Sequence, residues 1–162
     1  HGILFRGGAE AKIREGLLKD DLIEAVIGLG PNLFYGAGIP AAILLMRKDK
    51  PAERKNKVLI INAAEEFVEG KAQNHLSDAN VQRMAKAFHA FIDEDKFCRA
   101  VDMDEIEAND FNLNLSRYVS VEDDEVIIDV AAAVAKRKLL TQERDAAGAR
   151  IMGFLKELGY DA

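Results

Sequence analysis

The chain has 162 residues, 49% of them hydrophobic, and this length fits one domain, or one domain with an appendage, around a sizeable core. A single cysteine, Cys98, excludes a disulfide framework and a cysteine-based zinc site, and it favours a reduced, cytoplasmic setting. The net charge of −6 argues against indiscriminate nucleic-acid binding, and no apolar run approaches the roughly 20 residues of a membrane span. Residues 1–57 nevertheless hold ten Lys and Arg against seven Asp and Glu, so we expect an anionic partner to meet this part.

The first 62 residues predict one helix and four strands. The helix is expected over 9–19, where apolar side chains recur at helical spacing at Ala9, Ile13 and Leu17. Continuous apolar runs, typical of strands in a sheet that helices cover on both faces, occur at 3–5, 23–29, 41–46 and 58–61. The last two runs flank a short charged connection with no room for a crossover helix, so we expect them to pair antiparallel.

Helices are expected to dominate the remaining residues. Ser77 is suited to the N-cap of an amphipathic helix over 78–94. Its apolar stripe consists of Val81, Met84, Ala85, Phe88, Phe91 and Ile92. Residues 102–121 look irregular, and 129–158 predicts one long helix or two, with Gly159 as the stop signal.

The glycine-rich segment 30–39 supports two interpretations. The string from Gly36 to Ala41 matches a nucleotide-binding fingerprint, but that motif needs a helix after it, and the next run predicts a strand. Pro40 also lacks an amide to donate to a phosphate. Phe34, between the glycines, either packs beneath the loop or stacks on a planar ligand such as a base pulled out of a duplex. Spacing alone favours packing.

Residues 47–57, RKDKPAERKNK, gather six basic and two acidic side chains. A solvated hairpin tip and a phosphate-binding segment are about equally supported, because the run lies in the basic part of the chain. The side chains that would contact a phosphate backbone are Arg47, Lys48, Lys50, Arg54, Lys55 and Lys57.

The other chemistry-bearing residues predict no catalytic centre. The histidines, His1, His75 and His89, lack companions at ligand spacing, so we expect no metal site. The carboxylates at 102–110 and 122–125 are typical of solvated faces. In NDFNLNLSRYV, residues 109–119, asparagines alternate with apolar residues, which indicates either a half-buried strand or a long loop that the asparagines brace.

Three stretches, HGILFRGGAEAKIREGLLKDDLIEAVIGL, NLFYGAGIPAAILLMRK and NDFNLNLSRYV, together resemble the C-terminal part of the modification subunit of type I restriction–modification systems. The resemblance covers nearly the whole chain, and its most specific piece is the asparagine-rich stretch. The family-motif positions of unassigned role there are Asn109, Asn112, Asn114, Arg117 and Tyr118. Because the chain begins with His1 inside an apolar run, we expect it to be a piece of a longer protein.

The resemblance implies an adenine-N6 DNA methyltransferase that uses S-adenosylmethionine and flips its target adenine. It implies an α/β fold, the C-terminal half of a Rossmann-like methyltransferase sheet followed by a helical C-terminal tail. It also implies that Phe34 stacks against the flipped base, and it reverses the preference for packing. The family's catalytic Asn- or Asp-Pro-Pro-aromatic motif is absent, because Pro31, Pro40 and Pro51 are not adjacent. We therefore expect neither donor binding nor catalysis from this chain alone.

The expected organisation has three parts: strands and helix of the methyltransferase sheet at 1–62, a helix and asparagine-rich connection at 63–121, and a helical tail at 122–162. The tail carries an apolar seam at Leu140, Ala147, Ile151, Phe154 and Leu158. This seam either packs back onto its own domain or binds another subunit. The resemblance implies DNA, a specificity subunit and a restriction subunit as partners, and no membrane. The alternative is a non-enzymatic protein-interaction module.

Overall fold

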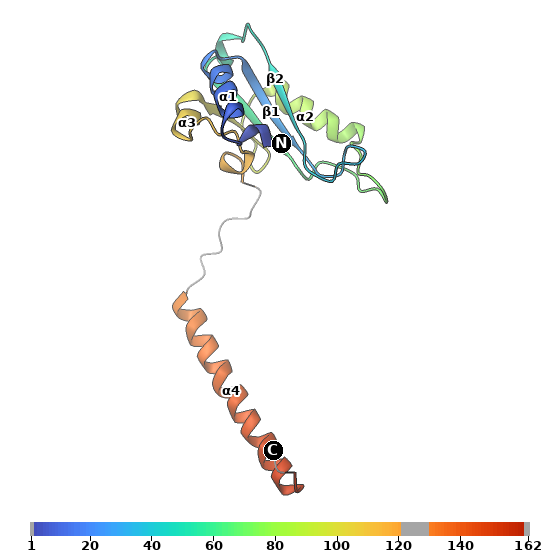
Figure 1. Cartoon of the computed structure of the whole chain (residues 1–162), viewed down its shortest axis with the longest axis vertical. Coiled ribbons are helices and arrows are strands. Elements are labelled where there is room, and N and C mark those ends of the chain that lie inside the picture. Colours follow the sequence, from blue (N-terminus) through green and yellow to red (C-terminus); the bar gives the residue numbers. More distant parts are fainter. Residues whose placement is uncertain (1, 121–129, 161–162) are drawn as a thin grey trace. The chain divides into compact units, whose positions relative to one another are not determined.

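The sheet is organised around β1 (Ile23–Leu29), a strand in which every residue is buried. The computed structural model describes residues 2–120 and 130–160, and the chain divides into two units between residues 122 and 123 (Figure 1). In these residues the first unit holds four strands with helices on both faces, and the second holds one helix, α4 (Val130–Glu157). The mixed α/β class that the apolar runs predicted is confirmed.

The strands of the described part of the chain lie in the order β2-β1-β3-β4. The three strands that accompany β1 are β2 (Ala42–Met46), β3 (Lys57–Ala63) and β4 (Cys98–Asp102). β1 pairs antiparallel with β2 and parallel with β3, and β4 pairs antiparallel with β3. The sheet therefore continues through a fourth strand beyond residue 62, the boundary expected for it.

The predicted pairing of the runs 41–46 and 58–61 with each other is wrong. β2 and β3 do run in opposite directions, but β1 lies between them and pairs with both. A strand as apolar as β1 needs a partner on each edge, because its buried backbone groups have no water to bond to. The central place in the sheet satisfies this need, and the connection over 47–56 passes the start of β1.

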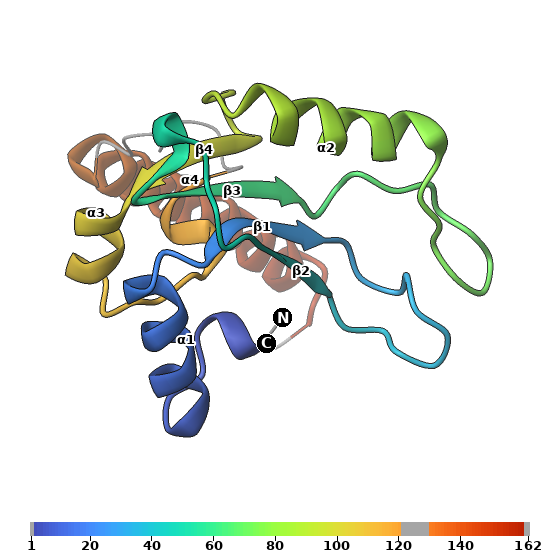
Figure 2. The same ribbon diagram turned by 90° about the horizontal axis from the view of Figure 1, so that it is seen from above.

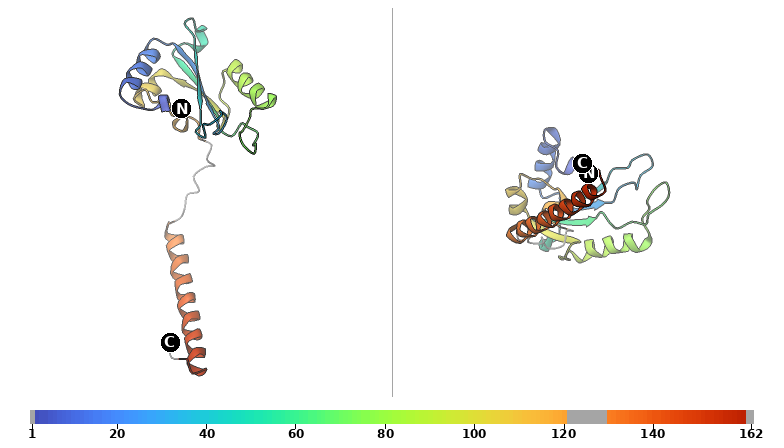
Figure 3. Two further views of the ribbon diagram at one scale, coloured as in Figure 1. Left: turned by 45° about the vertical axis from the view of Figure 1, so that its right-hand side comes forward. Right: turned by 90° about the horizontal axis from the view of Figure 1, so that it is seen from below.

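Helices cover the two faces of the sheet separately. Figures 2 and 3 show α1 (Ala9–Lys19) and α3 (Met103–Ala108) on one face and α2 (Asp78–Ala90) on the other. Because side chains alternate along a strand, Ile60 of β3 joins the core layer under α1 and α3, and Ile61 joins the layer under α2. Both faces of the sheet are therefore buried.

The bounds of α1 agree with the predicted helix, but its buried face differs. Ile13 is 62% exposed, whereas Leu18 and Arg14 are buried. The Arg14 guanidinium donates hydrogen bonds to the carbonyl oxygens of Phe111 and Ile3, both at 2.7 Å. Arginine is polar, so the spacing of apolar residues does not indicate that its long side chain reaches inward and donates to buried carbonyls.

The predicted strand at residues 3–5 is wrong. The segment forms a 3-10 turn, η1 (Gly2–Leu4), in which Leu4 alone is buried. Its carbonyl oxygen accepts a hydrogen bond from the Leu113 N–H at 2.9 Å. The run is too short to pair along a sheet edge, and it contributes one apolar side chain, that of Leu4, to the core.

The N-terminus of α2 is as predicted. The Ser77 hydroxyl accepts from the Asn80 N–H at 3.3 Å, and the Asn80 side chain accepts from the Ser77 N–H at 3.0 Å. The helix ends at Ala90 rather than residue 94, because Phe91 takes a left-handed conformation with φ of 51°. Neither β4 nor α3 was predicted: the five residues of β4, CRAVD, show neither a continuous apolar run nor a regular alternation, and pairing with β3 completes the strand.

We predict that Ser77→Ala lowers the free energy of unfolding by about 1 kcal/mol, because the first turn of α2 loses its side-chain acceptor. Urea denaturation followed by circular dichroism measures this change. Ser77→Asp is the matched control, since aspartate accepts the same hydrogen bond, and it should remain near wild type. Equal stability of the alanine variant would show that the cap contributes nothing here.

Candidate functional site

Two long connections extend beyond the same end of the sheet. Residues 30–41, here called the aromatic loop, join β1 to β2, and residues 64–77, here called the facing loop, join β3 to α2. Because β1 and β3 are parallel, their carboxyl ends share one edge, where α/β proteins commonly bind ligands. Figure 2 shows both loops projecting there.

Hydrogen bonds join the two loops. The Gln73 side-chain amide donates to the Leu33 carbonyl oxygen at 2.7 Å. The Asn74 backbone N–H donates to the Asn32 carbonyl oxygen at 2.8 Å, and the Asn74 side-chain amide donates to the Pro31 carbonyl oxygen at 3.0 Å. Three successive carbonyls of the aromatic loop are therefore held by two successive residues of the facing loop.

Gly30 lets the loops approach each other at their base. A Cβ at this position would lie 2.5 Å from a ring carbon of Phe67 and 2.6 Å from the carbonyl oxygen of Ala64. The second contact is with backbone, so it cannot be relieved by a change of rotamer. Only glycine permits the facing loop to start so close to the end of β1.

The glycine string of the aromatic loop makes a turn. The Phe34 carbonyl oxygen accepts from the Ala37 N–H at 3.0 Å, and Gly36 has φ of 72°, the third-position conformation of a type II turn. The string then leads into β2 rather than into a helix. It therefore lacks the helix N-terminus that a nucleotide-binding fingerprint requires.

A pocket of about 410 Å³ opens between the loops. Its lining combines apolar and polar side chains, from Leu29, Leu33, Phe34, Gln73, Asn74, His75 and Leu76. Phe34 is 55% exposed at this pocket, whereas its neighbour Tyr35 is 98% exposed at the tip of the turn. An aromatic ring beside polar hydrogen-bonding groups suits a flat, heteroatom-rich ligand.

The basic segment, residues 47–57, lies at the opposite end of the sheet, because β2 runs from the aromatic loop back to the start of β1. It includes one 3-10 turn, η2 (Ala52–Arg54). Four of its six cations form ion pairs: Arg47 and Arg54 with Glu24, Lys50 with Asp21, and Lys57 with Asp102. The structure does not bring this segment together with Phe34.

The expected phosphate contacts of Lys50 and Arg54 are corrected by the structure, because both side chains are already bound within the domain. The Lys50 side chain is 1% exposed, and its ammonium donates to Asp21 at 2.5 Å and to the Lys57 carbonyl oxygen at 2.9 Å. Arg54 donates to Glu24 at 3.1 Å and to the His89 carbonyl oxygen at 2.9 Å. Both side chains fasten the segment to the domain and leave no free cation for a phosphate.

The asparagine-rich segment 109–119 is a braced loop, one of its two expected forms. The Asn112 side chain accepts from the Asn114 N–H at 2.9 Å, and the Tyr118 hydroxyl donates to the Asn112 carbonyl oxygen at 2.6 Å. Arg117 donates to the Asn109 side chain at 3.1 Å. The loop contributes Leu113 and Leu115 to the core, so these polar side chains stabilise a packed connection.

In its described residues, 130–160, the second unit is one helix, so the expectation of one helix or two for 129–158 resolves to one. Gly159, with φ of 79°, follows its C-terminus as predicted. The seam residues Leu140, Ala147, Ile151, Phe154 and Leu158 are exposed, since no other element packs against α4 in the described part of this unit. The acidic run 122–125 lies outside the described residues.

Sequence comparison decides the family. The family profile described as N-6 DNA Methylase matches residues 1–126, which is most of the chain. The chain belongs to this methylase family. The match spans the sheet, both loops and the asparagine-rich segment, and it ends before α4.

Curated relatives of this methylase chain carry more specific descriptions. It is 42% identical over 160 residues to the type I restriction enzyme MjaVIII methylase subunit of Methanocaldococcus jannaschii, covering 97% of this chain and 28% of the relative. It is 32% identical over 129 residues to the MpnII methylase subunit of Mycoplasma pneumoniae, covering 80% of this chain and 23% of the relative. The chain thus spans under a third of the length of these relatives.

Solved structures share the fold of the methylase chain. The type I restriction-modification methyltransferase subunit of Streptococcus thermophilus aligns with a TM-score of 0.71 at 39% identity, over 75% of this chain and 25% of that one. The EcoKI M protein aligns with a TM-score of 0.56 at 18% identity, over 99% of this chain and 40% of that one, which shows similarity of fold alone.

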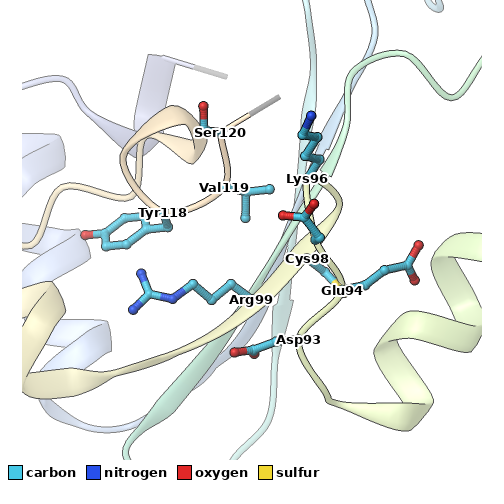
Figure 4. Close-up of a pocket in the computed structure, with 9 residues that line it drawn as sticks. Asp93, Glu94, Lys96, Cys98, Arg99, Tyr118, Val119 and Ser120 are labelled. Atoms are coloured by element: carbon cyan, nitrogen blue, oxygen red, sulfur yellow. The ribbon is translucent and has the colours of Figure 1, made fainter. Parts of the chain in front are cut away.

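A second hollow in this chain, of about 260 Å³, lies between β4 and residues 118–120 (Figure 4). Arg99, on its wall, is held by both Glu105 carboxylate oxygens at 2.8 and 2.7 Å. Cys98 donates to the Ile92 carbonyl oxygen at 3.3 Å, and burial raises the pKa of its thiol. The thiol stays protonated at neutral pH, so it is unsuited to act as a nucleophile.

The residues that the structure describes hold neither a metal-binding cluster nor a membrane-spanning helix. No group of three or more His, Cys, Asp or Glu side chains gathers there as a metal ion would require. No helix among them is long and apolar enough to cross a membrane. His75 contributes to the pocket beside Phe34, and the ring of His89 lies 5.7 Å from that of Phe88 on α2.

The facing loop is a part of the site that no sequence pattern indicated. Gln73 and Asn74 lie about 40 residues from the carbonyls that they hold. A polar dipeptide in a loop has no periodicity, and its partners are backbone atoms that any sequence supplies. The parallel pairing of β1 and β3 was the missing information, because it brings their following loops to one edge.

We predict that Lys50→Ala lowers the free energy of unfolding by about 3 kcal/mol, because it leaves Asp21 without its buried partner. Lys48→Ala removes an exposed cation of the same segment and should change stability by less than about 0.5 kcal/mol. Chemical denaturation of both variants makes the comparison. Equal effects would contradict the structural assignment of Lys50.

Proposed function

We propose that this chain forms the target-side part of a type I restriction–modification DNA methyltransferase subunit, which methylates N6 of adenine in DNA. Phe34 carries the proposal: its half-exposed ring borders a pocket between two hydrogen-bonded loops at the ligand-binding edge of the sheet. The relatives described as methylase subunits of type I restriction enzymes support the reaction class.

Stacking explains why such a site would use a phenylalanine. A base taken out of the duplex loses its stacking neighbours, and an aromatic face restores about 1–3 kcal/mol per base. Phe34 is the first residue of the hydrogen-bonded turn that contains Gly36, and this turn fixes the direction of the loop after the ring. The polar side chain of His75 in the same lining then offers a partner to the edge of the base.

S-adenosylmethionine would supply an electrophilic methyl group in the full-length enzyme. The described residues do not fit this donor, because the glycine string opens a strand rather than a helix. The sequence also has no two adjacent prolines, and so no Asn-Pro-Pro or Asp-Pro-Pro motif. The proposal therefore assigns donor binding and methyl transfer to other parts of the full-length protein, and no transfer to this chain alone.

The two edges of the sheet support its being the C-terminal half of a Rossmann-like sheet. At β4 the outer N–H groups are occupied, since Asp93 accepts from Ala100 at 2.8 Å and the Glu94 carbonyl accepts from Cys98 at 2.9 Å. At β2 the outer edge has no such cover in the described chain, and Ile43 is exposed there. An open apolar edge invites another strand, so we propose that the sheet continues beyond β2.

The helical tail is proposed as the contact with other subunits. α4 presents the exposed apolar residues Leu140, Ile151 and Phe154, and such a seam needs a covering partner. A specificity subunit, which would read the DNA sequence, is the proposed partner, with a restriction subunit in the same assembly. The same seam is what favours the alternative function, a non-enzymatic protein-interaction module.

We predict that Phe34→Ala in the full-length, assembled enzyme lowers base flipping and methyl transfer by roughly tenfold or more, because the flipped adenine loses its stacking surface. Fluorescence of 2-aminopurine at the target position and transfer of labelled methyl groups measure the two effects. Tyr35→Ala is the matched control, since Tyr35 is outside the pocket lining. Unchanged flipping and transfer in Phe34→Ala would refute the proposal and favour the interaction module.

We propose a narrower DNA-backbone contact for the basic segment, limited to Lys48 and Lys55. Both are exposed, and among the described residues neither forms an ion pair. The double alanine variant should reduce the slope of log K for DNA binding against log salt by roughly 1.8, because each lost phosphate contact contributes about 0.9. An unchanged slope would leave the segment a purely structural role.

A further inference from the structure

The facing loop has a role that neither the family match nor the sequence motifs assign. We propose that Gln73 and Asn74 are positioning residues that set the stacking geometry of Phe34 by holding the backbone directly before it. The inference rests on the proposed function, because it concerns how the base-stacking residue is held. We call these two residues the clip.

The geometry of the clip fixes a continuous stretch of backbone. Its three hydrogen bonds reach the carbonyls of Pro31, Asn32 and Leu33 in order, and Leu33 is bonded to Phe34. After Phe34, the turn bond from Ala37 holds the chain on the other side. A backbone held both before and after a residue restricts the direction of its side chain, which a stacking surface requires.

The clip is itself anchored to the domain. Val68 and His75 exchange two backbone hydrogen bonds, at 2.8 and 3.0 Å, which close the facing loop into a hairpin. At the start of this loop, Glu66 accepts from Arg83 and, at 3.1 Å, from the Asn80 side chain, both on α2. Helix α2 therefore holds the facing loop in place, and the facing loop in turn holds the aromatic loop.

A purely structural role for the clip would predict a different result. If the hydrogen bonds only stabilised the fold, their loss would lower the melting temperature and leave the flipping equilibrium of the folded enzyme unchanged. If the clip positions Phe34, its loss would impair flipping in an enzyme that remains folded. The effect would also disappear when Phe34 itself is absent, because residues acting through one group are not additive.

The test uses Gln73→Met in the full-length, assembled enzyme. Methionine matches glutamine in length but removes the donor to Leu33 without adding charge near DNA. Gln82→Met, the same exchange at an exposed position of α2, is the matched control. The probe is a duplex with 2-aminopurine in place of the target adenine, in a recognition site first mapped by sequencing methylated DNA. Melting temperature and donor binding are measured alongside.

We expect Gln73→Met to lower the flipping equilibrium constant roughly three- to tenfold, the loss expected for one hydrogen bond. Melting temperature and donor binding should stay near wild type, Gln82→Met should have no effect, and Phe34→Ala combined with Gln73→Met should match Phe34→Ala alone. If Gln73→Met does not assemble, Asn74→Leu removes the neighbouring donor to Pro31, again without adding charge, and carries the same expectations.

Two outcomes would overturn the inference, and they can be told apart. If Phe34→Ala impairs flipping while Gln73→Met behaves like Gln82→Met, the clip is wrong and the proposed function stands. If Phe34→Ala has no effect on flipping, the proposed function fails and the clip fails with it. Full additivity of the two substitutions would also exclude a clip that acts through Phe34.

Discussion

Burial of β1 is the constraint on which the rest of this structure depends. All seven of its residues are buried, and they include Glu24. A strand of this kind needs a partner on each edge and a layer on each face, and β2, β3 and the helices supply them. The buried carboxylate of Glu24 requires compensation as well, and Arg47 and Arg54 provide it. Some of the cations of the basic segment therefore serve to stabilise the fold.

The parallel pairing of β1 with β3 is what creates the candidate site. It places the aromatic loop and the facing loop at one edge, where four hydrogen bonds and the close approach at Gly30 join them. The opposite end of the sheet carries the basic segment, most of whose cations are paired. In this arrangement the aromatic residue and not the glycine string bears the proposed function, because the glycines shape the turn that presents Phe34.

Sequence reasoning succeeded where local signals decide the structure. Helical spacing gave the bounds of α1, continuous apolar runs located β1, β2 and β3, and the serine before α2 marked its start. It failed where tertiary partners decide: Arg14 turns inward to reach carbonyls, β4 forms by pairing with β3, and strand order depends on which strand is most buried. The family resemblance singled out Phe34, but the residues that hold it come from a loop without a local pattern.

Photocrosslinking tests the central claim most directly. The target adenine of a mapped recognition site is replaced by 5-iodouracil, which forms a covalent adduct with an aromatic ring stacked on it under ultraviolet light. The account predicts that, in the assembled full-length enzyme, mass spectrometry finds the adduct on Phe34. An adduct confined to a residue outside the aromatic and facing loops would contradict the claim that this segment receives the target base.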